Sequence, residues 1–367
     1  MKILVITPRY TIAGVPLAQI RFARALASQG HHVEIMIGYI EQGYNLPDME
    51  GIKIHDLNKP NVRSMFWSIW KFLLFQKPDL VFSAEDHLTA TVLIAAILSL
   101  SKAKISGSSR VTPYDTYSNI FFSKRWFLKK IIRAVMWRAD VLSCVSEDMV
   151  AQYKNVFKNP PHVCIYNIVD DKNSRERMLE PLTHEWLLNK SCPVIIGAGK
   201  LAEWKGFSDL ILAINECVKS DEVRLIILGD GPLRDKLQDQ IDSLKLNKYI
   251  SLLGYVENPL NFYFNADIFV LSSRVEGLPN VLVEAMMCGC TAVSTDCPTG
   301  PRELLADGKY GYLVPVGNPA LMAEAIITAI SKPISSENLN QAIKPFEETA
   351  VIKRHFEMLG IPEVLKI

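Results

Sequence analysis

Short apolar runs alternate along the chain with longer runs in which apolar residues recur at helical spacing. The runs at residues 2–7 and 268–271 are short, apolar and rich in β-branched residues, which predicts buried strands. Residues 16–29 predict an amphipathic helix that ends at Gly30. This alternation is typical of parallel β-α-β units. Further strands are predicted at residues 32–38, 80–83, 141–145, 163–166, 194–197, 223–228, 250–253 and 291–294.

One stretch interrupts this series of strands and helices. Residues 170–177 are polar and have no periodic pattern, which favours a linker. We therefore expect an α/β protein with a first domain at residues 1–169, a linker at residues 170–189 and a second domain at residues 190–345. Each domain would be doubly wound, and the two would face each other over a cleft.

Composition agrees with two domains and gives no reason to expect nucleic acid as a partner. The chain has 367 residues, 49% of them hydrophobic, and a formal net charge of only +1. Its seven cysteines include no C-x-x-C pair, which fits a reducing compartment, so we expect a cytoplasmic protein. The most apolar helix, at residues 88–100, is shorter than the roughly 20 residues needed to span a bilayer.

The chain lacks the patterns that indicate a metal or an ATP-binding loop. It contains no D-x-D, no H-E-x-x-H and no Cys/His cluster, so we expect no metal and no cofactor. The absence of G-x-x-x-x-G-K-[ST] argues against a P-loop ATPase. A loose G-x-G-x-x-A at residues 197–202 leaves a nicotinamide dehydrogenase as a weak alternative.

Two carboxylates, Glu276 and Glu284, lie eight positions apart across a predicted strand–helix junction. Glu276 is expected in a loop at the carboxyl end of a strand, and Glu284 just over one turn into the next helix. Ligands bind at this edge of open α/β sheets, and a helix start offers N–H groups to an anion. The amides of Asn280 and Val281 are candidates for that contact, whereas Pro279 has no N–H. Helix capping and surface charge are the alternative interpretation.

A loop bounded by glycines follows the predicted strand at residues 194–197. It carries Lys200 and Lys205, two ammonium groups that can clamp a diphosphate and offset charge on a departing group. A solvated basic loop is the alternative interpretation.

These segments resemble motifs of the retaining glycosyltransferases of family 4 (glycosyl transferases group 1), which have the GT-B fold. The stretch from Glu276 to Glu284 resembles the family's E-x7-E motif, and residues 199–206 resemble its phosphate-binding G-[RK]-L-x-x-x-K-G. Residues 228–234, 253–256 and 299–311 resemble three further motifs, so five fall in order. The N-terminal half matches only loosely, through a strand, a Gly-containing turn and a helix.

The resemblance implies a fold, an activity and roles for these residues. The fold would be two facing Rossmann-like domains, with a tail helix at residues 346–367 crossing back onto the first. The activity would be metal-independent transfer of a hexose or N-acetylhexosamine from a UDP-sugar donor to a hydroxyl acceptor. Lys200 and Lys205 would stabilise the leaving diphosphate. Glu276 would bind hydroxyls of the donor sugar, and Glu284 those of the ribose.

Four more residues are implied as donor-binding. Gly14 lies between the first strand and helix, where a glycine lets backbone approach a phosphate or sugar; a plain turn is the alternative. Gly231 and Leu233 lie in the turn at residues 228–234, and Val256 lies in the segment assigned to the nucleotide base.

The acceptor side departs most from the family. Relatives often carry a His in a first-domain loop near residues 106–115, and this chain has none there. Arg110 is a candidate to replace it, and Asp115 a candidate to orient the acceptor hydroxyl. His87, after the strand at residues 80–83, is a third candidate, although a loop His is more often without special function.

Residues 121–138 contain six basic residues and no acidic one, with apolar residues at helical spacing. This pattern predicts a basic amphipathic helix that lies on an anionic membrane, which would make the protein peripheral to the inner face. A core-packed helix with a basic outer side is the alternative. The membrane hypothesis favours a lipid-linked or surface-polysaccharide precursor as the acceptor.

Two other functions remain open at this point. One is another enzyme of the same fold, such as a nucleotide-sugar epimerase or a glycogen-type synthase. The other is a non-catalytic nucleotide-sugar-binding protein, against which the paired lysines and glutamates argue. Neither the donor sugar, nor the acceptor, nor the oligomeric state is readable from these motifs.

Overall fold

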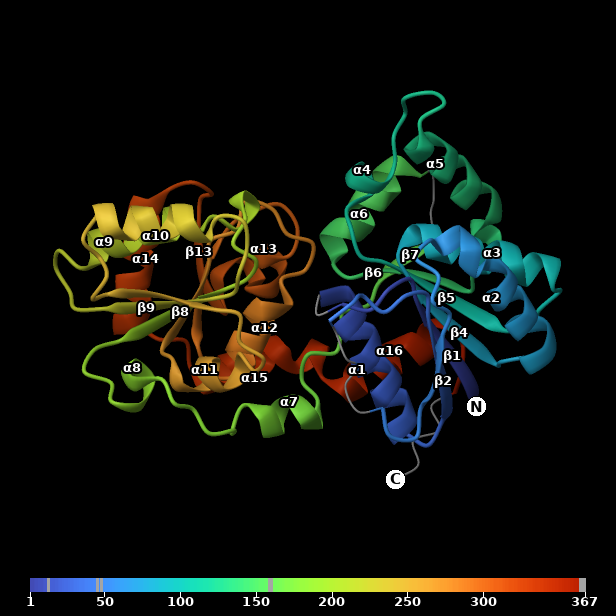
Figure 1. The fold of residues 1–367 in the computed structure, drawn as a ribbon, viewed down its shortest axis with the longest axis horizontal. Coiled ribbons are helices and arrows are strands. Elements are labelled where there is room, and N and C mark those ends of the chain that lie inside the picture. Colours follow the sequence, from blue (N-terminus) through green and yellow to red (C-terminus); the bar gives the residue numbers. More distant parts are fainter. Residues whose placement is uncertain (12–13, 44–45, 47–48, 158–160, 363–367) are drawn as a thin grey trace. The chain divides into compact units, whose positions relative to one another are not determined.

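The computed structural model describes residues 1–11, 14–43, 46, 49–157 and 161–362. The chain divides into two compact units. The first comprises Met1–Ile168 and the tail from Glu348, and the second comprises Val169–Glu347 (Figure 1). The chain therefore leaves the first unit once, builds the whole of the second, and returns to the first.

The first unit is built on a seven-stranded parallel sheet with the order β3-β2-β1-β4-β5-β6-β7. The order runs outward in both directions from β1 and β4, which confirms the predicted doubly wound arrangement. The strands are β1 (Lys2–Thr7), β2 (His32–Ile37), β3 (Lys53–Asp56), β4 (Leu80–Ala84), β5 (Lys104–Ser109), β6 (Val141–Cys144) and β7 (His162–Cys164). The helices are α1 (Gly14–Ser28), α2 (Val62–Gln76), α3 (Asp86–Leu98), α4 (Pro113–Thr116), α5 (Lys124–Val135), η1 (Met136–Arg138), α6 (Glu147–Val156) and α16 (Glu348–Met358).

Helices from opposite ends of the chain share one core in the first unit. Ile3 of β1 and Phe22 of α1 belong to the same buried cluster as Val351, Ile352 and Phe356 of α16. The predicted tail helix at residues 346–367 thus begins at Glu348 and packs on this unit, and residues 363–367 lie outside the described part.

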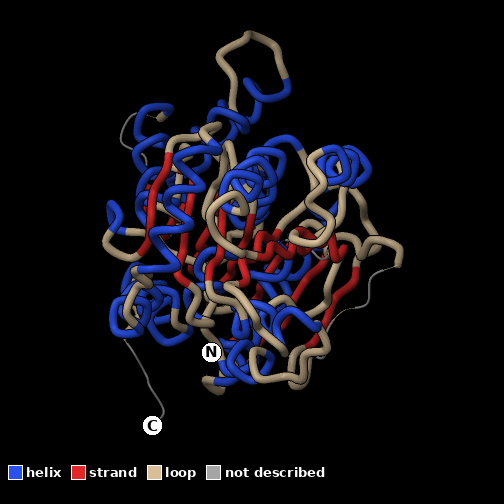
Figure 2. Tube along the Cα trace, turned by 90° about the vertical axis from the view of Figure 1, so that its left-hand side faces the viewer, coloured by secondary structure: helices blue, strands red, loops and turns tan. Residues whose placement is uncertain are grey.

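The second unit has a six-stranded parallel sheet with the order β10-β9-β8-β11-β12-β13. Helices α9, α10 and α14 lie on one side of its strands and α11, α12 and α15 on the other (Figure 1). Figure 2 shows strands in red between helices in blue. The strands are β8 (Val194–Ala198), β9 (Arg224–Leu228), β10 (Ile250–Gly254), β11 (Ile268–Leu271), β12 (Thr291–Thr295) and β13 (Gly311–Val314). The helices are α7 (Lys172–Arg177), α8 (Glu185–Leu188), η2 (Glu203–Lys205), α9 (Phe207–Cys217), α10 (Arg234–Ser243), α11 (Leu260–Asn265), α12 (Asn280–Met287), α13 (Pro301–Leu304), η3 (Ala306–Gly308), α14 (Pro319–Ser331), α15 (Ser336–Ile343) and η4 (Lys344–Phe346).

Several elements differ from the prediction. Residues 170–189, predicted as a linker, contain α7 and α8 and group with the second unit. Residues 106–109, placed in a loop, belong to β5, whose sequence KISGSS is too polar for the apolar pattern to reveal. The basic segment at residues 121–138 is not one helix, because α5 begins only at Lys124, where Ser123 caps it. No described helix is long and apolar enough to cross a membrane.

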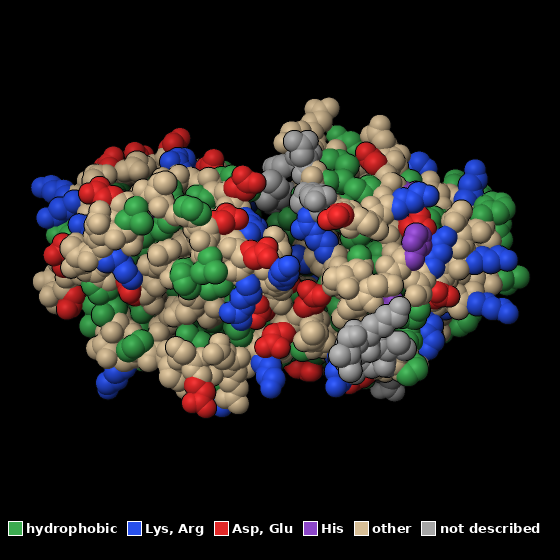
Figure 3. All heavy atoms as spheres, turned by 90° about the horizontal axis from the view of Figure 1, so that it is seen from below, with side chains coloured by type: hydrophobic (Ala, Val, Ile, Leu, Met, Phe, Trp, Pro, Cys, Tyr) green, Lys and Arg blue, Asp and Glu red, His purple; other side chains and the backbone are tan. Residues whose placement is uncertain are grey.

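The surface of the molecule carries charges of both signs. On the face of the second unit drawn in Figure 3, acidic and basic side chains are interspersed. This pattern matches the small net charge of the sequence.

The buried His355 of α16 makes the core of the first unit sensitive to acid. Its ring centroid lies 4.8 Å from that of Phe22 and 5.4 Å from that of Phe82. Burial, together with the positive charge of Arg110, lowers the pKa of His355 to about 3. The folded protein therefore keeps this imidazole neutral at neutral pH.

Replacing His355 by Phe is expected to make the protein less sensitive to acid. The unfolded chain takes up a proton at His355 below about pH 6.5, and the folded chain only near pH 3, so stability falls as pH falls through this window. One proton corresponds to about 1.4 kcal/mol per pH unit. The measurement is urea unfolding of both proteins between about pH 7 and about pH 5. As the pH falls, the free energy of unfolding of H355F is expected to rise relative to that of the unaltered protein, with roughly this slope. A difference independent of pH would contradict the neutral, buried imidazole.

Candidate active site

The strand order of the second unit reverses between β8 and β11, and charged residues follow both of these strands. Lys200 and Lys205 lie in the loop after β8, and Glu276 lies in the loop after β11. The carboxyl ends of strands beside such a reversal are where α/β sheets bind ligands. The topology thus brings together Lys205 and Glu276, which lie 71 residues apart in sequence.

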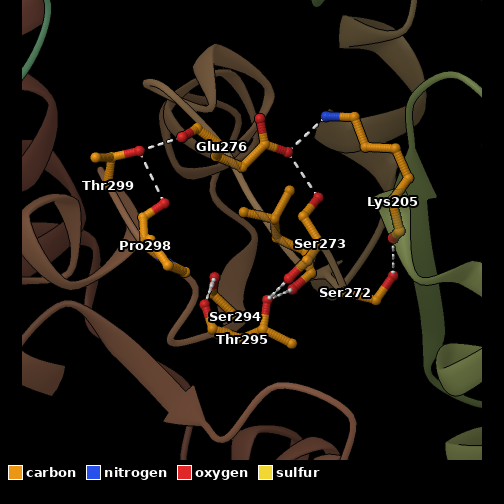
Figure 4. A network of polar contacts seen from close by, with 9 residues as sticks. Lys205, Ser272, Ser273, Glu276, Ser294, Thr295, Pro298 and Thr299 are labelled. Atoms are coloured by element: carbon orange, nitrogen blue, oxygen red, sulfur yellow. Dashed lines mark hydrogen bonds and ion pairs between the residues drawn. The ribbon is translucent and has the colours of Figure 1, made fainter. Parts of the chain in front are cut away.

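Lys205 and Glu276 form a direct ion pair (Figure 4). The Nζ of Lys205 donates to Oε1 of Glu276 at 2.5 Å, and the side chains are only 17% and 12% exposed. Ser273 Oγ donates to the same carboxylate oxygen at 2.6 Å. A pair so far withdrawn from water interacts more strongly than a surface pair, and each partner depends on the other for neutralisation.

A second serine ties the lysine loop to the end of β11. Ser272 Oγ donates to the carbonyl oxygen of Lys205 at 2.7 Å, and the Arg274 N–H donates to that of Trp204 at 2.7 Å. Gly206 has φ 65°, and a Cβ on it would lie 2.0 Å from the Ser272 carbonyl oxygen. Only glycine fits this close approach of two backbones, which explains the glycine directly after Lys205.

The turn after β9 supports the lysine loop from another side. A Cβ on Gly231 would lie 2.5 Å from the Leu201 carbonyl oxygen, and the Leu233 N–H donates to this oxygen at 3.0 Å. The Gly231 N–H donates to Asp230 Oδ1 at 2.7 Å. Gly231 and Leu233, expected to bind the donor, thus contact the lysine loop. Val256 follows β10 and is half-buried.

The two lysines of the loop differ in their surroundings. The stem of Lys205 lies against Gly199, with its Cδ and Cε 3.5 Å from the position of a Cβ there. Lys200 is exposed, and no hydrogen bond or ion pair joins it to the residues that the structure describes. Lys205 is therefore held in place, whereas Lys200 extends into solvent.

Helix α12 begins at Asn280, with Pro279 at its N-cap position. The Asn280 N–H donates to the Leu278 carbonyl oxygen at 3.0 Å, so this candidate for anion binding is engaged within the turn. Val281 lies in the first turn of the helix. Glu284 is 9% exposed and lies just over one turn into the helix, where the sequence places it.

Two thiols near these carboxylates are unreactive at neutral pH. Burial, with the charge of Glu276, raises the pKa of Cys297 to about 11. Burial, with the charge of Glu284, raises the pKa of Cys288 to about 12. Both thiols therefore stay protonated. Across the described ranges, no group of three or more His, Cys, Asp or Glu side chains is placed to hold a metal ion.

The acceptor candidates lie in the first unit, near the carboxyl ends of β4 and β5. The guanidinium of Arg110 donates to the side-chain oxygen of Asn167. Burial lowers the pKa of Arg110 to about 10, although the negative charge of Glu85 raises it in part. His87, in the first turn of α3, has Nε2 3.3 Å from Glu85 Oε2. Asp115 is exposed on α4. Glu85 therefore interacts with two of the three candidates.

Glu85 is a candidate that the sequence analysis missed. Its φ of 74° is rare for a residue other than glycine. Burial raises its pKa, and the charges of His87 and Arg9 lower it in part. A carboxylate directly after a buried strand is the signal that would have identified it.

Gly14, expected to let backbone approach the donor, is the first residue of α1. It is exposed, and no described atom lies within 4 Å of where its Cβ would be. No described neighbour therefore requires glycine at this position.

Two family models match the chain, each over one part of it. Residues 14–173 match the model named Glycosyltransferase Family 4, and residues 181–345 match the model named Glycosyl transferases group 1. An uncharacterised glycosyltransferase of Methanocaldococcus jannaschii is 32% identical over 278 residues, covering 67% of this chain and 66% of that protein. The N-acetylgalactosamine-N,N'-diacetylbacillosaminyl-diphospho-undecaprenol 4-alpha-N-acetylgalactosaminyltransferase of Campylobacter jejuni is 32% identical over 233 residues, covering 63% of this chain and 61% of that protein. The chain thus spans slightly under two thirds of the length of these relatives.

A solved structure extends the similarity to nearly the whole chain. The structure of HepE of Anabaena, in complex with UDP and glucose, superposes with a TM-score of 0.74. It covers 98% of this chain and 99% of that chain at 19% sequence identity, so it supports the fold alone. With glycosyltransferase models matching the two parts of the chain in turn, this protein belongs to the group 1 glycosyltransferase family and has the GT-B fold.

Proposed function

We propose that this protein is a retaining glycosyltransferase that moves a hexose or N-acetylhexosamine from a UDP-sugar to a hydroxyl group of a glycan acceptor. The observation that carries the proposal is the buried Lys205–Glu276 pair at the reversal of the second sheet. The Campylobacter relative, named as an N-acetylgalactosaminyltransferase, and HepE, solved with UDP and glucose, support this class of donor.

In this proposal the bound donor breaks the Lys205–Glu276 ion pair and becomes the partner of both side chains. Diphosphate oxygens take up the ammonium of Lys205, which frees the Glu276 carboxylate to accept hydrogen bonds from the sugar hydroxyls. Lys200, exposed on the same loop, adds a second positive charge to the diphosphate. Glu284 accepts hydrogen bonds from the ribose hydroxyls. The first turn of α12 adds the positive end of a helix dipole.

The proposed reaction breaks one bond and forms one bond at the anomeric carbon, on the same face of the sugar. The bond to the diphosphate oxygen breaks, the acceptor oxygen bonds to this carbon, and the acceptor proton passes to the departing diphosphate. Lys205 and Lys200 stabilise the charge that develops on the leaving group. The step uses no metal ion and no covalent nucleophile. The high pKa of Cys297 agrees with the latter, because this thiol is protonated at neutral pH.

The acceptor is proposed to be a lipid-linked or surface-polysaccharide glycan precursor, reached by a cytoplasmic enzyme peripheral to the membrane. The name of the Campylobacter relative, which includes diphospho-undecaprenol, supports an acceptor of this kind. Arg110, His87 and Asp115, with Glu85 beside the first two, are the residues proposed to bind it.

A panel of nucleotide sugars tests the donor and the metal requirement together. With EDTA present, one UDP-sugar is expected to raise the melting temperature and to release UDP slowly by hydrolysis, because the proposed site neutralises the diphosphate with lysines and a helix dipole and without a metal ion. The control is the panel without EDTA and with added Mg²⁺. A donor that is only isomerised would indicate an epimerase. Failure of every nucleotide and nucleotide sugar to bind would contradict the assigned roles of Lys205 and Glu276.

A further inference from the structure

The loop before α5 presents three consecutive apolar side chains to solvent. Ile120, Phe121 and Phe122 are 73%, 73% and 79% exposed. The loop stands out from α4 and α5 in the first unit (Figure 1). Single exposed apolar residues are ordinary, but a cluster of large ones marks an interaction surface.

Helix α5 extends this apolar surface. The ring centroid of Phe122 lies 6.3 Å from that of Phe127, which is 47% exposed. Ile131, one turn further along the helix, is 42% exposed. We call Ile120, Phe121, Phe122, Phe127 and Ile131 the apolar tip.

The other side of α5 is not available to a partner. Ile132 is only 3% exposed, and α5 packs on α3. The sequence favours a basic amphipathic helix lying flat on a surface, but the structure instead anchors the helix and leaves the loop and one apolar stripe exposed.

The base of the loop is fixed by polar contacts. Tyr117 OH donates to Asp86 Oδ2 at 2.6 Å, and Lys129 Nζ donates to Asn119 Oδ1 at 2.8 Å. The guanidinium of Arg125 also donates to the Tyr114 carbonyl oxygen. The apolar tip is therefore held out in a defined position, so little conformational entropy is lost when it binds a partner.

The surroundings of the apolar tip are positively charged. Residues 116–139 contain six basic residues and no acidic one. Lys124, Arg125, Lys130 and Arg133 are exposed, and Lys130 Nζ lies 5.3 Å from the ring centroid of Trp126. The partner must therefore offer an apolar interior and negative charge around it.

We propose that the apolar tip inserts into the interface of an anionic lipid bilayer, while the surrounding lysines and arginines contact lipid phosphates. A bilayer offers both features, because acyl chains lie directly beneath a negatively charged headgroup layer. A second copy of this chain fits less well, because a two-fold contact would place the same cations against each other. This inference rests on the membrane attachment in the proposed function, for which it names the residues that contact the bilayer. It does not depend on the Lys205–Glu276 pair.

Co-sedimentation with vesicles tests the proposal. The protein is expected to bind phosphatidylcholine vesicles that contain phosphatidylglycerol, and F121S/F122S is expected to bind at least about tenfold more weakly, since it loses the apolar area that inserts. The matched control is F75S, because Phe75 on α2 is 71% exposed but lies outside the tip. The charge-reversal variant K130E/R133E is expected to lose the preference for vesicles with phosphatidylglycerol over pure phosphatidylcholine. Circular dichroism and melting of each variant check that the fold is kept.

Three results would overturn the proposal. The first is absence of binding by the unaltered protein at low salt, and the second is equal binding by F121S/F122S. The third is that the unaltered protein is a dimer that does not bind vesicles, and that F121S/F122S is a monomer. This result would assign the surface to self-association. A K205M variant separates this test from that of the proposed function, since it is expected to lose transfer activity and keep vesicle binding.

Discussion

Lys205→Met and Glu276→Gln are each expected to reduce turnover by about 10²–10³-fold or more, because each removes a group that stabilises charge or orients the donor in the proposed reaction. Each change also leaves the other side chain buried without its ion-pair partner. We expect each single variant to lose about 2–3 kcal/mol of stability, somewhat less than the about 3–5 kcal/mol for a broken, fully buried pair, since both side chains keep some solvent access.

The double variant K205M/E276Q separates stability from activity. It removes both charges together, so it is expected to regain most of the stability that each single variant loses, while turnover stays as low as in the worse single variant. Urea unfolding and UDP release with the identified donor measure the two effects. K190M is the control: Lys190 pairs with Asp267 at 2.7 Å before β11, with both side chains more than a third exposed, and its loss should change neither quantity much.

Near-normal turnover in either single variant would refute the proposed roles. A double variant as unstable as the sum of the single variants would show that the two side chains are stabilised separately, not by each other.

Gly206→Ala is expected to disrupt the site far more than Gly289→Ala, although both glycines have positive φ. Gly289, at the end of α12, has φ 97° and no described atom within 4 Å of a Cβ, so alanine there meets only backbone strain of about 1–2 kcal/mol. At Gly206 a Cβ would lie 2.0 Å from the Ser272 carbonyl oxygen, and backbone must move to make room.

The movement at Gly206 reaches the proposed chemistry directly. Ser272 Oγ holds the Lys205 carbonyl, so displacing either backbone displaces the ammonium from Glu276. We expect G206A to lose about 3 kcal/mol or more of stability and at least about tenfold in UDP affinity, against about 1–2 kcal/mol and no loss of affinity for G289A. Thermal unfolding and calorimetric titration with UDP measure both. Equal behaviour of the two variants would mean that the contact with Ser272 relaxes without moving the loop.

The second sheet and the local placement of its carboxylates were predictable from sequence because their signals are local. The run at residues 268–271 is apolar enough to identify β11, and the residues around Pro279 mark the start of α12. The pairing of Lys205 with Glu276 was not predictable, because it depends on β8 and β11 being neighbours in the sheet although β9, β10 and several helices separate them in the chain.

Other features escaped prediction for different physical reasons. β5 has glycine and serines where a buried strand usually has branched apolar residues, so only its neighbours β4 and β6 identify it as a strand. The supporting role of Gly231 is a contact between two loops, which no spacing reveals. Likewise, whether the apolar residues of the segment at 121–138 are buried or exposed depends on α3, which covers one side of α5 only.

The order in which the chain leaves and re-enters the first unit affects its folding during synthesis. The second unit is one continuous stretch, so it can fold as soon as the ribosome has released it. The first unit, although begun earlier, lacks Val351, Ile352 and Phe356 of its core until α16 emerges. An N-terminal domain usually folds first, but here the unit that is synthesised second is complete first. Until α16 is synthesised, the first unit exposes an apolar face that chaperones can bind.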